Sequence, residues 1–234
     1  MIEIKNLTRR FEMQPGFLTV LDNLSARFDE KALTVIVGRS GCGKTTLLKL
    51  IAGLDSPDGG SISVPEGLRT GMVFQEARLM PWLTCEKNIA FGRRKGKTKE
   101  DIARLIEMVG LKGFERAYPS QLSGGMQQRA ALARALAADA GLILMDEPFA
   151  ALDYFTRAQM QKELMRIRRE SGMGAILVTH NIDEALILAD DLAVMARGKI
   201  AREYHIDGHE RDLFSPRLIS IKKDILAAME GEEK

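Results

Sequence analysis

The stretch LTVIVGRSGCGKTTLLKLIAGL, residues 33–54, decides the fold of this chain. Leu33–Val37 is an unbroken apolar and β-branched run, typical of a strand that is buried on both faces. A glycine-rich loop follows at residues 38–43, and the pattern LLKLIAGL then indicates a helix. Because a buried strand, a glycine loop and a helix in this order begin a parallel sheet with covering helices, the stretch predicts an α/β protein.

The loop and the start of the helix match the pattern GxxxxGK[ST] at residues 38–45, called the phosphate loop below. Glycines let successive backbone N–H groups converge on phosphate oxygens, and the helix N-terminus adds its positive end. Lys44 is expected to bridge the terminal phosphates, and Thr45 to offer a hydroxyl to Mg²⁺. The alternative, a plain glycine-rich turn, is weakened by the strand and helix on either side. The predicted nucleotide-binding residues here are Gly38, Arg39, Ser40, Gly41, Cys42, Gly43, Lys44, Thr45 and Thr46.

The composition is that of a folded, nearly neutral protein. Of 234 residues, 45% are hydrophobic, and 34 Lys and Arg face 32 Asp and Glu, for a net charge of +2. Nucleic-acid-binding domains usually carry a clear basic excess, so no nucleic-acid partner is expected. Two cysteines are too few for a secreted disulfide scaffold. The N-terminus lacks the apolar core of a signal peptide, and Arg134 and Asp139 interrupt the most apolar stretch, so we expect a cytoplasmic protein.

Hydrophobic patterns extend the α/β prediction along the chain. Alternation at residues 2–7 and 20–28 indicates a half-exposed antiparallel sheet, and residues 56–60 form a turn cluster. Further strands are expected at residues 71–74, 141–145, 175–179, 192–196 and 199–203, and helices at residues 99–109, 124–138, 154–170, 182–188 and 216–230. A helix-rich lobe therefore interrupts a parallel α/β pattern. We expect one domain over residues 1–234, with a core of residues 1–78 and 141–234 and a helical subdomain at about 79–140.

Two adjacent carboxylates, Asp146 and Glu147, end the apolar run LILM at residues 142–145. At a strand end beside the phosphate loop, Asp146 would join the coordination of Mg²⁺, and Glu147 would polarise an attacking water. Taken alone the pattern is weak, because many strands simply leave the core in this way.

The signature segment LSGGMQQR, residues 122–129, has two readings. Ser123 can cap the helix that follows. Ser123 with Gly124 and Gly125 at a helix start is also a second surface that could bind phosphate. Since one nucleotide does not need two such elements from one chain, the economical arrangement is a head-to-tail dimer. Each chain would then offer its signature segment to the other chain's nucleotide.

Together these motifs resemble those of the nucleotide-binding subunits of ABC transporters, over nearly the whole chain. The set comprises the phosphate loop, VFQE at 73–76, the signature segment, Asp146-Glu147, ALD at 151–153 and VTH at 178–180. The resemblance implies a P-loop NTPase core with a parallel sheet, an N-terminal antiparallel β-subdomain and an inserted helical subdomain. It also implies an ATPase that uses ATP and Mg²⁺.

The resemblance assigns roles to single residues. Gln75 would sense Mg²⁺ and the attacking water, and His180 would contact the γ-phosphate. Glu147 would be the catalytic base, and Lys44 would also act in catalysis through the terminal phosphates. Ser123 and Gly125 would contact the partner's γ-phosphate, and Asp153 would link the two sites. The implied Mg²⁺ ligands are Thr45, Gln75 and Asp146.

The resemblance also points to an aromatic residue for the adenine contact. Phe11 falls where the family usually has an aromatic that stacks on adenine. A plain role as a core or strand residue stays open as the alternative, because Phe17 is also nearby.

The segment MPWLTCEKNIAFG, residues 80–92, is most similar to the nitrate, sulfonate and taurine importer branch. Trp82 in it is read either as core or as part of a groove that receives a membrane subunit's helix. The implied partners are a second ATPase subunit, as a homodimer or a pair, integral membrane permease subunits and, indirectly, a solute-binding protein. The implied location is the inner face of the cell membrane. A GTPase would carry an Asn-Lys-x-Asp sequence, which is absent, whereas an exporter or cell-division ATPase stays open.

Overall fold

The computed structural model describes residues 1–93, 98–150, 152–206 and 211–230. These residues form two compact units, Met1–Gly67 with Ala175–Lys234, and Leu68–Gly174. The mixed helix and strand content confirms the predicted α/β class. The predicted division into a core and a helical subdomain at about 79–140 stays a prediction.

An antiparallel sheet in the first unit has the order β2-β1-β4. Its strands are β1 (Ile2–Glu12), β2 (Phe17–Phe28) and β4 (Gly59–Ser63). The predicted antiparallel sheet is confirmed, and the alternation holds at Ile2 and Ile4, which are buried; a register shift between Ile4 and Leu7 then brings Leu7 into the core as well. The turn expected at residues 56–60 is partly wrong, because β4 begins at Gly59. A Cβ on Gly60 would lie 2.3 Å from the Asn6 carbonyl oxygen, so the glycine allows two backbones to meet where a turn is expected.

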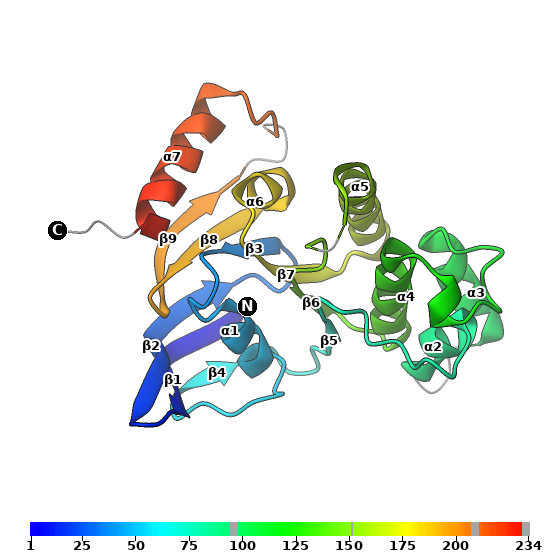
Figure 1. Cartoon of the computed structure of the whole chain (residues 1–234), viewed down its shortest axis with the longest axis horizontal. Coiled ribbons are helices and arrows are strands. Elements are labelled where there is room, and N and C mark those ends of the chain that lie inside the picture. The colour runs from blue at the N-terminus through cyan, green and yellow to red at the C-terminus, as the bar shows by residue number, and fades with distance from the viewer. Residues whose placement is uncertain (94–97, 151, 207–210, 231–234) are drawn as a thin grey trace. The chain divides into compact units, whose positions relative to one another are not determined.

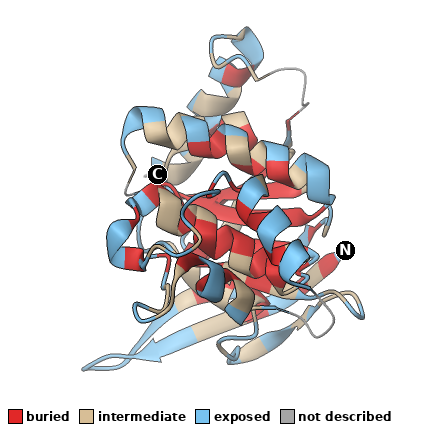
Figure 2. Ribbon diagram, turned by 90° about the vertical axis from the view of Figure 1, so that its right-hand side faces the viewer, coloured by how far each residue is buried: buried red, intermediate tan, exposed pale blue. Residues whose placement is uncertain are grey.

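The second sheet of this unit runs in the order β7-β3-β8-β9. Strand β3 (Leu33–Val37) is parallel to β7 (Gly174–Thr179) and β8 (Asp191–Ala196), and β9 (Lys199–His205) is antiparallel to β8. Every residue of β3 is buried, as its apolar run predicts. In Figure 1, α6 (Ile182–Leu188) and α7 (Pro216–Glu230) lie on one side of this sheet, and α1 (Lys44–Ile51) lies on the other. Figure 2 shows buried positions along strands and on the inner sides of helices.

The second unit pairs β5 (Thr70–Val73) in parallel with β6 (Leu142–Asp146). Its helices are α2 (Cys85–Phe91), α3 (Lys99–Met108), α4 (Gly124–Ala137) and α5 (Tyr154–Ser171), with a 3₁₀ turn at Pro119–Gln121. Small residues let α4 lie close to its neighbours. A Cβ on Gly92 of the α2 C-cap would lie only 2.6 Å from the Arg134 carbonyl oxygen. Helix α4 is therefore the packing centre of this unit.

Within the described residues, no helix combines the length and the apolar character that crossing a membrane requires.

Candidate functional site

The phosphate loop lies between β3 and α1, as the sequence predicts. Its shape depends on two glycines at which side chains do not fit. A Cβ on Gly38 would lie 2.4 Å from the Met195 carbonyl oxygen, and one on Gly43 would lie 2.9 Å from the Val20 carbonyl oxygen. Gly43 also has a φ of 106° and caps α1 without a side-chain hydrogen bond. The loop backbone is therefore seated on β2 and β8, while Arg39, Ser40 and Gly41 are exposed.

Lys44 is buried at the first position of α1, with 5% of its surface exposed. Its Nζ donates to the carbonyl oxygens of Gly38 at 2.7 Å and Arg39 at 3.0 Å. These bonds aim the ammonium along the inside of the loop, where a single charge is worth more than at the surface. Cys42, Thr45 and Thr46 are half-buried on the same turn.

His180 follows the last residue of β7 directly and is exposed. Val37 and Thr179 are partners in the parallel register, and the Gly38 N–H donates to the Thr179 carbonyl oxygen at 3.3 Å. The chain thus leaves two neighbouring strands at the same edge of the sheet, once into the phosphate loop and once into His180. The structure brings these two predicted elements together.

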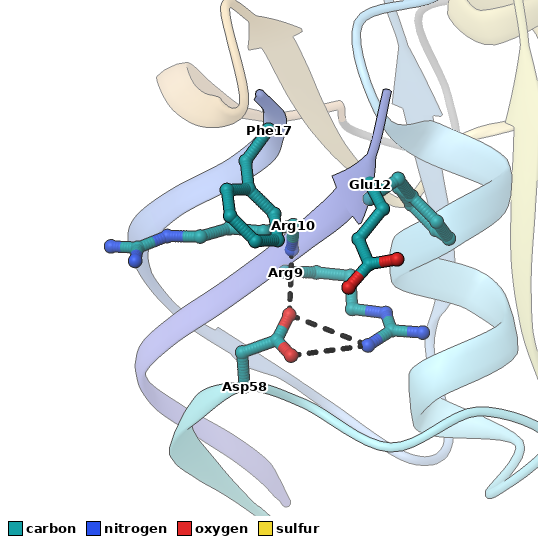
Figure 3. A pocket seen from close by; sticks show the side chains of 6 residues that line it. Arg9, Arg10, Glu12, Phe17 and Asp58 are labelled. Atoms are coloured by element: carbon teal, nitrogen blue, oxygen red, sulfur yellow. Dashed lines mark hydrogen bonds and ion pairs between the residues drawn. The ribbon is translucent and has the colours of Figure 1, made fainter. Parts of the chain in front are cut away.

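Phe11 lines a pocket of about 460 Å³ near the tip of the β1–β2 hairpin, with Arg9, Arg10, Glu12, Phe17 and Asp58 (Figure 3). The Arg9 guanidinium carbon lies 4.8 Å from the centre of the Phe11 ring. Two carboxylates fix Arg9, since Asp55 accepts from its Nη2 at 2.9 Å and Asp58 accepts from its Nη1 at 3.3 Å. Phe11 is 38% exposed, so it is not a core residue, but it lies in β1, so the alternative of a plain strand residue stays open. Phe17, at 70%, lines the same pocket.

In the second unit, Gln75 and Glu147 lie at equivalent positions beyond paired strands. Val73 of β5 and Met145 of β6 are register partners, and each of the two site residues comes two positions later. Asp146, the last residue of β6, is 9% exposed, and Gln75 is exposed. Glu147 has a φ of 43°, a left-handed conformation that costs a residue with a Cβ on the order of 1 kcal/mol. A strained backbone at this point turns the chain sharply as it leaves the strand.

The signature segment starts α4, and the predicted cap is confirmed. Ser123 is the N-cap, and its Oγ accepts from the Met126 N–H at 3.3 Å. Gly125 is buried, and a Cβ there would lie 3.1 Å from Cγ2 of Thr156 in the first turn of α5. A side chain at this position would press on α5, so the second glycine has a packing reason as well as the predicted phosphate role.

Asp153 caps α5 with its carboxylate, which accepts from the N–H groups of Phe155 and Thr156, each at 3.1 Å. Hydrogen bonds from the Thr156 side chain and backbone hold the pKa of Asp153 below its ordinary value. Asp153 therefore has a structural role that its place in the ALD motif does not reveal. Ala151 of that motif lies outside the described residues.

Three buried or part-buried polar side chains bond to the backbone of residues 75–83, and none of them stands out in the sequence. Asn88 of α2 accepts from the Met80 N–H at 2.7 Å and donates to the carbonyl oxygens of Met80 and Leu83. Gln128 and Arg134 of α4 donate to backbone carbonyl oxygens just after β5. No sequence signal distinguishes them from helical polar residues that face water. Trp82 is 71% exposed, so the reading of Trp82 as core is wrong.

Comparison with known proteins gives a consistent result. The family model described as ABC transporter matches residues 21–150. An uncharacterized ABC transporter ATP-binding protein of Methanocaldococcus jannaschii is 43% identical, covering 99% of this chain and 92% of its own length. Aliphatic sulfonates import ATP-binding proteins of Bacillus subtilis and Paraburkholderia xenovorans are 43% and 45% identical, covering 92% and 89% of this chain and 89% and 82% of their own.

A solved dimeric ATP-binding cassette in a post-hydrolysis state, bound to ADP and Pi, superposes with a TM-score of 0.79. It is 30% identical, and the match covers 89% of this chain and all of the other. The fold, the matched motifs and the sequence relatives agree. The chain belongs to the ABC transporter family, as an ATPase subunit with the α/β phosphate-loop fold.

Proposed function

We propose that this ATPase works as a head-to-tail dimer that drives the import of a small organic anion, with aliphatic sulfonates as the first candidate. The observation that carries the substrate class is the identity of 43–45% to proteins named as sulfonate import subunits, over most of both chains. The chain acts as one ABC ATPase domain, and its helical subdomain, at about 79–140, carries the signature segment.

In the first unit, the triphosphate lies in the phosphate loop. Backbone N–H groups of the exposed part of the loop, the N-terminus of α1 and the ammonium of Lys44 neutralise its charge. His180, at the same sheet edge, contacts the γ-phosphate and steadies it during bond cleavage. Adenine stacks on Phe11, and the Arg9 guanidinium beside Phe11 limits how that ring can turn.

Two groups of the second unit handle the attacking water. Glu147 accepts a proton from it, or orients it, because a carboxylate in a partly desolvated site is a far better base than one in bulk water. The half-buried position of Glu147 supports this role. Gln75 hydrogen-bonds the same water, so that its oxygen approaches phosphorus in line with the leaving group.

The donor set fits Mg²⁺, which prefers hard oxygen ligands and keeps several waters. Thr45 offers a hydroxyl, Asp146 a carboxylate and Gln75 an amide oxygen. Among the described residues, no group of three or more His, Cys, Asp or Glu side chains could hold a metal ion. When bound, Mg²⁺ neutralises developing charge on the phosphates.

The dimer follows from the signature segment. Ser123 and Gly125 present a hydroxyl and backbone N–H groups at the start of α4, a helix long enough to carry an N-terminal dipole. Those donors bind the γ-phosphate held by the other chain, so ATP joins the two subunits and hydrolysis releases them. The Asp153 carboxylate accepts from the N–H of Thr156, whose methyl group lies against Gly125. Through this contact Asp153 links the two nucleotide sites of the dimer.

A membrane subunit docks on the aromatic side chains of the second unit. Trp82 and Phe91 are 71% and 66% exposed, which is unusual for such large apolar groups in one short region. An amphipathic helix of a permease would cover them. Through that partner the chain is held at the inner face of the membrane.

The import proposal is tested by uptake in cells that lack this gene. Cells that carry the parental gene should grow on an aliphatic sulfonate as sole sulfur source and should take up the labelled compound. Cells that carry Lys44→Ala should do neither, although they express the protein equally well. Normal sulfonate uptake in the deletion strain would contradict the substrate class. Export of a compound that depends on Lys44 would favour the exporter alternative.

A further inference from the structure

Residues 74–78, called the Gln75 segment below, are attached to α4 by side chains rather than by backbone pairing. Nε2 of Gln128 donates to the carbonyl oxygens of Phe74 at 3.2 Å and Gln75 at 2.6 Å. At the other end of the segment, Arg134 donates from Nη2 to Ala77 at 3.0 Å and from Nη1 to Arg78 at 2.9 Å.

The two donors lie six positions apart on one helix and hold both ends of the Gln75 segment. Within the segment, the Arg78 guanidinium carbon lies 4.0 Å from the centre of the Phe74 ring, and Arg78 has a φ of 45°. The segment is therefore folded on itself and fixed along α4. Its backbone is tied to α4 at both ends by these side-chain hydrogen bonds.

The hydrogen bonds of Gln128 indicate that this position needs the amide N–H groups of its side chain. The side chain is 8% exposed, and its Nε2 serves two carbonyl oxygens. Its own Oε1 is buried and has no hydrogen-bond partner in the described part of the chain. An unpaired buried acceptor is costly, and an apolar residue would avoid that cost in a purely structural core. The glutamine is therefore used to hold the two carbonyls.

Arg134 gives the same indication from the far end of the Gln75 segment. Burial lowers the pKa of its guanidinium, which reflects the cost of taking this cation out of water. In the described part of the chain, this guanidinium donates to the carbonyl oxygens of Ala77 and Arg78, so the charge is placed where it fixes the backbone.

We propose that Gln128, assisted by Arg134, is a positioning residue that makes Gln75 and the signature segment move as one body. Ser123 lies at the N-terminus of α4, and Gln128 lies on the following turns of the same helix. When α4 shifts to engage the partner's nucleotide, it therefore carries the Gln75 backbone with it. This inference rests on the proposed roles of Gln75 and Ser123.

The test is a double-mutant cycle on the steady-state ATPase activity of the full chain. Gln128→Leu should lower kcat by about ten- to hundredfold and change the KM for ATP little, because a displaced Gln75 no longer orients the water. In the Gln75→Ala background, Gln128→Leu should have no further effect on kcat. The two substitutions act on one step, so their effects should not multiply.

Gln127→Leu is the matched control. Its Nε2 donates to the carbonyl oxygens of Pro119 at 2.9 Å and Leu122 at 3.2 Å, and within the described residues it is not hydrogen-bonded to the Gln75 segment. Whatever its own effect on kcat, that effect should multiply with the effect of Gln75→Ala. Hydrogen exchange over residues 74–78 should be faster in Gln128→Leu and in Arg134→Lys than in Gln127→Leu.

The outcomes distinguish a failure of the proposed role of Gln75 from a failure of the positioning role of Gln128. If Gln75→Ala hydrolyses ATP at the parental rate, the proposed role of Gln75 is wrong. If Gln75→Ala is slow but Gln128→Leu lowers kcat by the same factor in both backgrounds, the positioning role is overturned while the role of Gln75 stands. If Gln128→Leu does not fold, Arg134→Lys takes its place in the same cycle. Multiplicative effects there would also overturn the proposal.

Discussion

The phosphate loop and the Gln75 segment both follow a buried strand, but they are held in opposite ways. The phosphate loop is seated from within, because Gly38 and Gly43 bring its backbone against the carbonyl oxygens of Met195 and Val20. The Gln75 segment is held from outside, by donors of a helix more than fifty positions later. The first arrangement is rigid in its own unit, whereas the second can move with the helix that holds it.

The largest effect on ATP binding and hydrolysis is expected from removing the ammonium of Lys44. Lys44→Ala should lower ATP binding and hydrolysis by on the order of a hundredfold or more, because a buried ammonium aimed into the loop is lost. Lys49→Ala, in the last turn of the same helix, should stay close to the parental protein. Binding of a fluorescent ATP analogue and a phosphate-release assay check both. Equal activity of Lys44→Ala and the parental protein would remove the phosphate loop from the mechanism.

Crowding within the phosphate loop predicts a stability series. Gly43→Ala combines a positive φ with a close backbone contact and should lower the free energy of unfolding by about 1–3 kcal/mol. Gly41→Ala has a φ of 82° but meets nothing within 4 Å, so it should lose less. Urea unfolding of both variants measures the difference. A larger loss for Gly41→Ala would mean that crowding does not set the loop's shape.

A smaller effect is expected at the pocket beside the hairpin. Phe11→Ala should raise the Kd for ATP by about three- to tenfold, since one base-stacking contact is lost. Phe17→Ala lines the same pocket and is the matched comparison. If Phe17→Ala weakens ATP binding and Phe11→Ala does not, adenine stacks on the other ring.

Cys42 lies in the first unit and Cys85 in the second. Their thiols should differ mainly in how easily a reagent reaches them. Burial raises the pKa of Cys85 to about 11 and also raises that of Cys42. At pH 8 only about one Cys85 in a thousand would be a thiolate even if reagents reached it. Cys42 is half-buried in the phosphate loop and should be alkylated slowly, faster at pH 9 than at pH 8, and less when ATP is bound. Mass spectrometry of iodoacetamide-treated protein checks this. Alkylation of Cys85 in the folded chain would contradict its burial.

The sequence predicts those elements whose signals lie within a few neighbouring residues. The run at residues 33–37, the glycine loop and the capping serine are local signals, and all lie where expected. Strand β4 was missed because GGSIS has no apolar alternation, and its pairing depends on Asn6, far away in the chain. The donors on α4 were missed because a glutamine in a helix looks the same whether it faces water or a distant carbonyl. The exposure of Trp82 likewise needed tertiary structure.

The central claim, that this chain hydrolyses ATP with Glu147 acting on the water, is tested most directly by Glu147→Gln. Single-turnover hydrolysis should slow by on the order of a hundredfold or more, while ATP binding stays at the parental level. The variant should also form an ATP-dependent dimer that size-exclusion chromatography with light scattering resolves. Hydrolysis by Glu147→Gln at the parental rate would contradict the account.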